Sequence, residues 1–549
     1  MNLKKIYSFL IIGLITIPVF IHGIDDDTFL DEMDNPSHLF SNVEQEHLSA
    51  SDGRECCFPL PNIGTEDAEN LLDFLTLLVN ANIPQVLTKN FFLGTNPVQS
   101  RSLLDLPSTG LDLTINDDHC HQLLINAFYN QTTKMKYRCN SPCIGSYLNI
   151  TSKDILEDLD ESILDSFGLN TDDVLDLMLR ANPFSLQQRR AGFMINYNRR
   201  WGRGTFGLNV PFYYFERNFF LSEKEQAVIA DAPVFQQFGP LSSDEDTLLQ
   251  YGYKNMLSDQ IGFGDIRFNG YYTFKDTDKQ YATIGAVLTL PTAFALAKHV
   301  FGGKYCKTKP RPLFDLVTVA SYVPPTDEQA TLLKNMFFEY STCVLHQLTA
   351  NLAYTSLGNY HHVTFGPRFE YNYKIRPHWA VKLYTDIQYF CPAKEPRFYI
   401  PVKDPAEFSD AVRDYENVNL AEENLLFLSR QITDFLFPKC ITTKVSPGFL
   451  VNLSAATWFK TKRTNIELGY NFWRQSTEKI TLDCKPAIPY YVCKGVKSGA
   501  YQNKLYARFL LKIPERCGGL HIGIYGDYTF QSFNIGKDFT LAVNTEFYY

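Results

Sequence analysis

Apolar and polar residues alternate along most of the chain after about residue 188, in segments of roughly ten or more residues. In the last segment Phe539, Leu541 and Val543 fall on one face, whereas Thr540 and Asn544 fall on the other. A period of two is typical of a β-strand with one apolar face. Because strands of soluble proteins usually have about five or six residues, segments of this length indicate strands that cross a bilayer at a tilt.

Eleven segments share this pattern, and none of their apolar positions is Asp, Glu, Lys or Arg although 20% of the chain is charged. They cover residues 193–197, 206–212, 266–274, 284–290, 363–371, 381–389, 449–453, 466–472, 505–511, 520–530 and 539–549. A soluble β-sandwich would also keep charge off one face. A membrane barrel is favoured because tight turns alternate with very long loops, and because every Trp lies near a segment end. These are Trp201, Trp379, Trp458 and Trp473.

The number of strands follows from tracing the chain backwards from Tyr549, with short turns at one end and long loops at the other. This alternation breaks once, between Ala293 and Thr342, which calls for one further strand at Leu313 to Val323. A first strand is expected from His121 to Asn130. We predict an all-β transmembrane protein, an antiparallel outer-membrane β-barrel of about 14 strands (roughly 12–16).

The region before the barrel divides into two parts. Residues 1–23 form a predicted signal peptide, with Lys4 and Lys5 before an apolar run and Gly23 at its end; the alternative is a membrane-anchoring helix. Residues 24–118 form a periplasmic or plug region, in which residues 68–79 are expected to be helical. This helical cap would plug the lumen, pack in the periplasm or recruit a partner.

The barrel domain is predicted to cover residues 119–549, with five long loops. The loops are residues 131–187, 220–260, 294–343, 391–443 and 476–499. Residues 152–180 and 405–437 have apolar residues at helical spacing, which predicts helical insertions in two of these loops.

The end of the chain resembles the C-terminal signal of bacterial outer-membrane barrels, in which an aromatic residue ends a run of alternating apolar positions. The matching residues are Phe539, Leu541, Val543, Phe547 and Tyr549. The resemblance implies insertion by a barrel assembly machinery into the outer membrane of a double-membraned bacterium.

A second resemblance covers about thirty residues. Gly262-Phe263-Gly264-Asp265-Ile266, followed by Leu288-Thr289-Leu290-Pro291-Thr292, is similar to a pattern in barrels for uptake of hydrophobic compounds, including long-chain fatty-acid transporters. Those families usually have Gly after Pro-Thr, whereas this chain has Ala293. The resemblance implies transport of an apolar compound.

Composition supports a membrane barrel and excludes other classes. Phe, Tyr and Trp make up 14% of the chain, as expected for the aromatic belts at membrane interfaces. A net charge of −9 argues against a nucleic-acid partner. The sequence contains no G-x-S-x-G, no H-E-x-x-H and no phosphate-binding glycine loop, so we expect neither an enzyme nor a cofactor.

The 12 cysteines favour disulfide bonds in an oxidising compartment. The candidate pairs are Cys139 with Cys143, Cys484 with Cys493, and Cys391 with Cys440, the last at the base of a long insertion. Cys56-Cys57 and His119-Cys120-His121 are rich in metal-binding residue types, but neither has the spacing of a structural zinc site. We therefore expect no metal.

Charged residues on the polar faces of the strands are expected to face the lumen. The candidates are Arg190, Arg267, Arg368, Lys382, Lys504, Arg508, Lys512, Asp265, Glu370, Asp386, Glu467, Asp527 and Glu546. Such residues either set the ion preference of an open pore or pair across neighbouring strands and hold a narrow barrel shut.

These observations indicate an outer-membrane channel for passive diffusion or uptake of small solutes, surrounded by outer-membrane lipid. One alternative is a plugged transporter whose hydrophobic substrate leaves sideways into lipid. Another is a closed structural or adhesive surface barrel with disulfide-bonded loops. The substrate and the oligomeric state are not encoded in these patterns.

The assignment of the two faces predicts opposite responses to an added charge. Leu468→Arg, on the lipid face, should lower the free energy of unfolding by about 2–4 kcal/mol near the bilayer midplane. Asn471→Arg, on the lumen face, should be tolerated. Urea titration of both variants in lipid vesicles measures the difference, and equal tolerance would contradict the membrane assignment.

Overall fold

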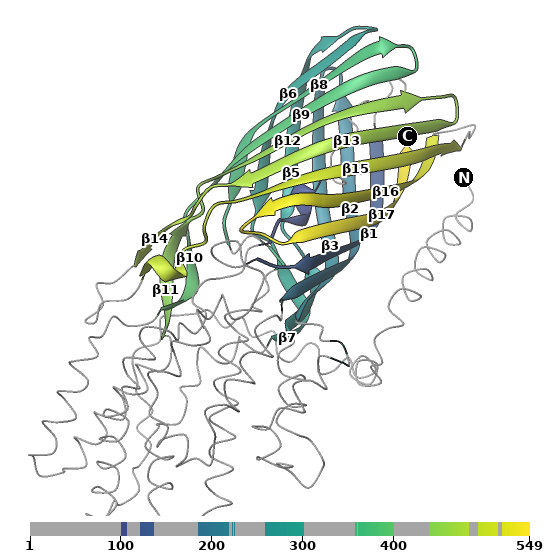
Figure 1. The fold of residues 1–549 in the computed structure, drawn as a ribbon. Coiled ribbons are helices and arrows are strands. Elements are labelled where there is room, and N and C mark those ends of the chain that lie inside the picture. Colours follow the sequence, from purple (N-terminus) through teal and green to yellow (C-terminus); the bar gives the residue numbers. More distant parts are fainter. Residues whose placement is uncertain are drawn as a thin grey trace, which may run out of the picture. The chain divides into compact units, whose positions relative to one another are not determined.

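The computed structural model describes residues 100–106, 121–136, 185–218, 222, 224, 258–300, 357–358, 361–399, 439–482, 492–513 and 519–549. All of them belong to one compact unit, Gly64–Tyr549. The described residues form a large antiparallel sheet that closes on itself and a small three-stranded sheet (Figure 1).

Twelve strands form the closed ring. In chain order they are β1 (His121–Lys134), β2 (Gln187–Trp201), β3 (Gly204–Asn218), β5 (Ile266–Asp276), β6 (Gln280–Leu290), β8 (Thr364–Arg376), β9 (Trp379–Phe390), β12 (Phe449–Lys460), β13 (Thr464–Gln475), β15 (Ala500–Ile513), β16 (Gly519–Phe533) and β17 (Lys537–Tyr548). The ring closes because β1 pairs with β17 on one side and with β2 on the other, and β2 pairs with β3.

The predicted strands are the strands of the ring, whose twelve strands are the lower end of the predicted 12–16 rather than 14. The eleven alternating segments and the strand beginning at His121 supply all twelve ring strands. No further strand is needed after Ala293, because β6 pairs directly with β8 from Gln280↔Tyr373 to Thr289↔Thr364. Residues 313–323 lie outside the described residues.

Two further strands, β4 (Ser258–Phe263) and β7 (Phe294–Val300), extend the sheet beyond the ring. β3 pairs with β5 along residues 204–209 and with β4 along residues 212–217. The chain therefore breaks pairing at Gly264-Asp265, between β4 and β5, and again at residues 291–293, between β6 and β7. We call this place the strand break; both motifs that resemble hydrophobic-compound transporters border it.

Local chemistry explains the strand break. Pro291 has no backbone N–H for a sheet hydrogen bond. The Thr292 hydroxyl accepts a hydrogen bond from Ile266 N at 2.9 Å, and the Asp265 carboxylate accepts one from Ala293 N at 3.2 Å. Side chains thus satisfy backbone groups that the interrupted ladder leaves without partners.

The outer face of the barrel is apolar and the inner face is polar, the reverse of a soluble protein. Leu505 is 58% exposed and Ile524 is 62% exposed, whereas Arg267 and Glu546 on the inner face are at most 2% exposed. A continuous exposed apolar surface on a closed barrel is the surface that a bilayer covers. The chain is therefore a β-barrel of the outer-membrane type. In the described part of the chain, no helix is long and apolar enough to span a membrane.

The aromatic belt differs from the prediction at one position. Trp201 and Trp379 lie at strand ends, and Trp201 is exposed. Trp473, by contrast, is 1% exposed and faces inward, where the guanidinium of Arg101 lies 5.6 Å from its ring centre. Proximity to a strand end could not distinguish the two faces.

The described residues do not support the predicted helical cap or helical loop insertions. Two complete helices lie within the described residues, and both are short 3-10 helices: η1 (Leu103–Asp105) and η4 (Val492–Gly495). The segments predicted to be helical, residues 68–79, 152–180 and 405–437, lie outside the described residues, as do residues 1–23. Long insertions instead supply a second sheet, formed by β10 (Ala393–Tyr399), β11 (Lys439–Ser446) and β14 (Lys479–Leu482).

Inward tyrosines cover glycines of neighbouring strands. The ring of Tyr506 lies where a side chain at Gly469 would be, and a ring atom of Tyr271 lies 2.8 Å from where a Cβ at Gly285 would be. An aromatic ring over a strand glycine buries the bare backbone and fixes the register.

Replacement of Gly469 should therefore destabilise the barrel. Gly469→Val forces the new side chain into Tyr506, and we expect a loss of about 1–3 kcal/mol in the free energy of unfolding. Gly270→Val is the control, since a Cβ at this outward glycine meets nothing within 4 Å. Urea titration in vesicles should separate the two variants, and equal midpoints would show that the ring contact carries no energy.

Candidate functional site: the occupied lumen

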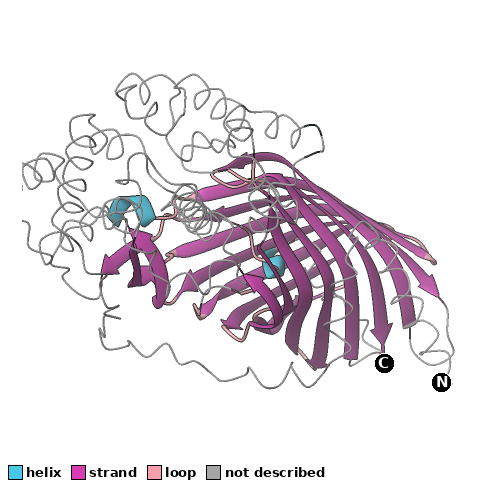
Figure 2. Cartoon of the chain, turned by 90° about the horizontal axis from the view of Figure 1, so that it is seen from below, coloured by secondary structure: helices cyan, strands magenta, loops and turns pink. Residues whose placement is uncertain are grey.

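The lumen contains a short piece of chain, residues 100–106, which we call the lumen segment. Its centre is η1, whose N-terminus is capped by the Ser102 hydroxyl at 3.3 Å from Leu104 N. Figure 2 shows this helix surrounded by the strands of the barrel. The segment occupies the place that the sequence analysis assigned to a helical plug, but it has only one short helical turn.

The lumen segment has an apolar side that packs against one part of the wall. Leu103, Leu104 and Leu106 are each at most 5% exposed. They belong to one cluster with inward residues of β1, β2, β3, β12, β15, β16 and β17. These residues are Phe128, Met194, Tyr213, Phe215, Ala456, Tyr506, Tyr525 and Ala542. Part of the lumen wall is thus apolar.

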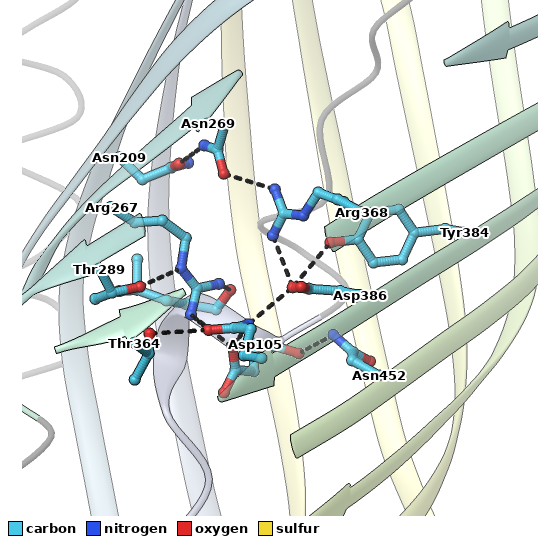
Figure 3. A network of polar contacts seen from close by, with 12 residues as sticks. Asp105, Asn209, Arg267, Asn269, Thr289, Thr364, Arg368, Tyr384, Asp386 and Asn452 are labelled. Carbon is cyan, nitrogen blue, oxygen red and sulfur yellow. Dashed lines mark hydrogen bonds and ion pairs between the residues drawn. The ribbon is translucent and has the colours of Figure 1, made fainter. Parts of the chain in front are cut away.

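The polar side of the lumen segment is held by charged and amide groups of β5, β9, β12 and β13. Asp105 accepts a hydrogen bond from Arg267 at 2.7 Å and one from Gln388 at 3.3 Å. Arg267 also donates to the Leu104 carbonyl at 2.6 Å. Figure 3 shows Asp105 and Arg267 facing each other inside the barrel. Because both side chains are at most 3% exposed, this pair lies away from bulk water.

Arg101 anchors the other end of the lumen segment. Its guanidinium donates to Asn471 at 2.8 Å, and the Arg101 carbonyl accepts a hydrogen bond from Arg190 at 2.7 Å. Asn471 is therefore part of the seat of the segment, and its replacement by Arg would displace Arg101. On the basis of this contact we now expect Asn471→Arg to unseat the lumen segment rather than to be tolerated.

Two buried networks of ion pairs continue around the lumen. In the first, Arg368 donates to Asp386 at 2.9 Å (Figure 3). Arg368 also donates to the Tyr271 hydroxyl at 2.6 Å. In the second, Lys504 donates to Asp527 at 2.9 Å and to Asp538 at 2.7 Å. Further pairs join Arg508 to Glu546 and, at 3.5 Å, Lys382 to Glu370. Ion pairs thus link β8 to β9, β15 to β16 and, across β16, β15 to β17 on the inner wall.

The structure places the predicted lumen residues on the inner side of the wall. Arg190, Arg267, Arg368, Lys382, Lys504, Arg508, Glu370, Asp386, Asp527 and Glu546 take part in the contacts above or in hydrogen bonds to the lumen segment. Of the others, Glu467 accepts from Tyr506 at 3.1 Å, Asp265 lies buried at the strand break, and Lys512 follows the inward register of β15. The candidates form several paired groups rather than one ring around a pore.

Sequence reasoning missed Arg101, Asp105 and Asp538. Asp538 follows the same alternation as Glu546 and could have been found from the register of β17. Arg101 and Asp105 lie in a short segment without strand periodicity, and no sequence signal brings them into the barrel.

The space left beside the lumen segment is small. A cavity of about 90 Å³ is lined by Ser100 and Arg101 of the lumen segment and by Trp473 and Lys497. Glu395 and Glu478, near the three-stranded sheet, also line it.

A second polar cluster ties the three-stranded sheet to the barrel. Glu395 on β10 lies 2.5 Å from His362 and 2.9 Å from Arg397, and Arg397 lies 3.1 Å from Glu478. Burial alone would raise the pKa of the Glu395 carboxyl, but Lys497, the hydrogen bond to His362 and the charge of Arg397 lower it to about 2. The carboxylate therefore stabilises this junction above pH about 4.5, and the contribution is lost as the pH falls towards 2.

The proposed disulfide between Cys391 and Cys440 does not form. Cys391 is a free cysteine, and Cys440 pairs with Phe398 on the opposite strand, seven residues further along the hairpin. At about 3.3 Å per residue this separation exceeds 20 Å, whereas disulfides need Cα atoms within about 7 Å. Cys139, Cys143 and Cys484 lie outside the described residues, as does the side chain of Cys493.

The C-terminal residues Phe539, Leu541, Val543, Phe547 and Tyr549 follow the outward register of the last strand. Tyr549 exchanges backbone hydrogen bonds with His121 at 2.9 and 3.1 Å and stacks on its ring. The chain end thus joins the start of β1. The described residues contain no group of three or more His, Cys, Asp or Glu that could hold a metal ion.

No protein-family model matches the chain, and no curated protein matches its sequence. Among solved structures, the chain is similar to an outer membrane channel of Pseudomonas putida F1, with 9% identity, 78% of this chain and 96% of that chain covered, and a TM-score of 0.36. It is also similar to the toluene transporter TbuX of Ralstonia pickettii (8% identity, 78% and 90% covered, TM-score 0.29). The chain is similar as well to the toluene transporter TodX of Pseudomonas putida, with 8% identity, 84% of this chain and 96% of that chain covered, and a TM-score of 0.29. Likenesses of this strength do not place the chain in a family.

The seat of the lumen segment is testable through its buried ion pair. Asp105→Asn leaves the Arg267 guanidinium buried without a counter-charge, at a cost of about 3 kcal/mol. We expect a cysteine introduced at Leu103 to react faster with a maleimide in the Asp105→Asn background, with mass spectrometry locating the label.

Asp276→Asn is the matched control, because Asp276 pairs with Arg200 at 3.2 Å but is 46% exposed. An exposed pair contributes about 0–1 kcal/mol, so this variant should not change the labelling rate at residue 103. Equal rates in the two backgrounds would show that Asp105 does not hold the segment.

Proposed function

We propose that this chain is an outer-membrane transporter of small apolar molecules, whose lumen is closed by residues 100–106, rather than an open channel for passive diffusion. The observation that carries the proposal is the seating of Leu103, Leu104 and Leu106 on an apolar part of the lumen wall. An open pore for hydrated solutes needs a continuous polar, water-filled lining.

The apolar wall gives the proposed substrate a binding surface. If the lumen segment moves, the leucines uncover Phe128, Met194, Tyr213 and the inward residues beside them. Ligand pockets are mostly apolar with a few placed polar groups, and Arg267 and Arg190 border this surface through their contacts with the segment. The substrate would thus take the place of the leucine side chains.

The strand break supplies a route sideways. Tyr213 on the apolar wall donates a hydrogen bond to the Leu357 carbonyl, and a side chain at Gly264 would meet both residues. Gly358 lies against Asp265 and Ala293, so residues 357–358 line the inner side of the break. In this proposal, an apolar molecule on this wall leaves towards the bilayer past residues 357–358.

The remaining features of the proposal concern location. We infer that the chain is exported by residues 1–23 and inserted by a barrel assembly machinery that reads the outward residues of β17. The barrel would then lie in the outer membrane of a double-membraned bacterium, with its long loops outside. The described part of the chain offers no catalytic constellation, and the proposal includes no enzymatic activity or cofactor.

Ion conductance in a planar bilayer tests the proposed closure of the lumen. We compare the full chain with a variant in which residues 101–106 are replaced by Gly and Ser at the same length. The full chain should be silent and the variant should conduct. Steady conductance in the full chain would contradict the proposal and indicate a porin.

The nature of the substrate needs a second readout. Vesicles that contain the full chain should take up an apolar fluorescent dye faster than empty vesicles, and a hydrophilic dye of similar size should not enter. The main alternative is a closed structural or adhesive barrel, which the pairing of the lumen charges favours. Absence of both conductance in the variant and dye uptake in the full chain would support that alternative.

A further inference from the structure

The strands β12, β13, β15, β16 and β17 lie side by side in the wall (Figure 1). Their outer side has a shallow, open groove of about 860 Å³, bordered by Leu468, Tyr470, Leu505 and Tyr528. Its lining includes no residue of the strand break, and it plays no part in the proposed transport.

The register explains the groove. One row of directly paired outward residues runs Leu468, Ala507, Gly526, Leu541 across four strands. The row above it runs Tyr470, Leu505, Tyr528, Phe539. The small residues Ala507 and Gly526 thus form a depression, and the large residues of both rows form its walls.

Polar groups follow directly above the groove, towards the long-loop end. Asn503 accepts a hydrogen bond from the Tyr470 hydroxyl at 2.7 Å and donates one to Gln531 at 2.8 Å. Four residues beyond Tyr470 on β13, Arg474 points outward and is exposed. Three strands away in the sheet, Lys537 begins β17 on the same outward side. One face of the wall therefore changes from apolar to amide to cationic over a few residues.

We propose that the groove, together with the amide and cationic groups above it, binds one anionic, phosphate-bearing lipid. This lipid belongs to the leaflet at the long-loop end. The head group would contact Arg474 and Lys537, the amides of Asn503 and Gln531 would contact the glycerol region, and one acyl chain would lie in the groove. The apolar band of the barrel faces the bilayer, and the groove is continuous with that band, so an acyl chain is the occupant that already surrounds it.

The dimensions fit a lipid in one leaflet. Arg474 and Leu468 are six residues apart on β13, about 20 Å at roughly 3.3 Å per residue. With a strand tilt of about 45°, this length corresponds to about 14 Å of depth, close to half of a hydrocarbon core of about 30 Å. A chain that starts at the cations therefore reaches the groove near the bilayer midplane.

Gly526→Leu tests the groove, because a side chain at this position fills it without disturbing the wall. A Cβ at Gly526 meets only ordinary contacts, the nearest being Leu541 Cδ2 at 3.5 Å. Gly270→Leu is the matched control, an outward glycine on β5 with nothing within 4 Å of a Cβ. Each variant is reconstituted with an equal mixture of phosphatidylglycerol and phosphatidylcholine, and retained lipid is counted by native mass spectrometry.

The full chain and Gly270→Leu should each retain one phosphatidylglycerol. Since the new leucine fills the depression and removes the packing contacts of the acyl chain with the wall, Gly526→Leu should lower retention severalfold. Arg474→Gln changes an exposed residue and tests the proposal even if Gly526→Leu fails to fold. It should reduce the preference for phosphatidylglycerol about two- to fivefold. Lys275 is an exposed cation at the short-turn end of β5, far from the groove in the strand order. Lys275→Gln should therefore leave the preference unchanged.

Two results would overturn the proposal. In the first, Gly526→Leu and Arg474→Gln retain phosphatidylglycerol as the full chain does. In the second, Gly526→Leu leaves retention intact but converts an oligomer into a monomer, which would make the groove an interface between copies of the chain.

Discussion

Closure of the strand ring is the constraint on which the rest of the structure depends. In hydrocarbon every backbone N–H and C=O must find a partner within the protein, and a sheet meets this condition only when its first and last strands pair. β1 does this by pairing with β17 along twelve positions. The closed ring then has two faces with opposite solvents, and the alternation along every strand follows from that difference.

A closed ring encloses a lumen, and the contents of this lumen explain the arrangement of its charges. The charged side chains inside the barrel are buried, so each loses hydration and needs a compensating partner. Arg267 forms an ion pair with Asp105, and Arg368 forms one with Asp386. Lys504 pairs with both Asp527 and Asp538. Where the segment presents leucines, the wall is apolar instead. The lumen is thus complementary to seven residues of its own chain.

The sequence predicted the strands well because a single physical signal repeats in each of them. Every ring strand separates lipid from lumen, so alternation alone located them. The count failed at Ala293, because the β6–β8 pairing that removes the extra strand joins residues far apart in sequence. Trp473 was misplaced because position along a strand does not report which face a residue takes.

The candidate site was predictable only in part for the same reason. Inward charges such as Arg368 and Glu546 follow the strand register, and Asp538 follows it as well. The seat of the lumen segment does not, since Arg101 and Asn471 meet across 370 residues of chain without any periodic signal. The free Cys391 shows that a sequence position can also mislead. Cys391 and Cys440 flank one insertion in the sequence, but the hairpin does not bring them together.

The pairing of β1 with β17 also bears on the filling of the lumen. The lumen segment precedes β1 in the chain, whereas its contacts lie on β2, β5, β9, β12 and β13. Its seat is therefore complete only when these strands share one closed wall, and closure by β1 and β17 and filling of the lumen depend on the same ring.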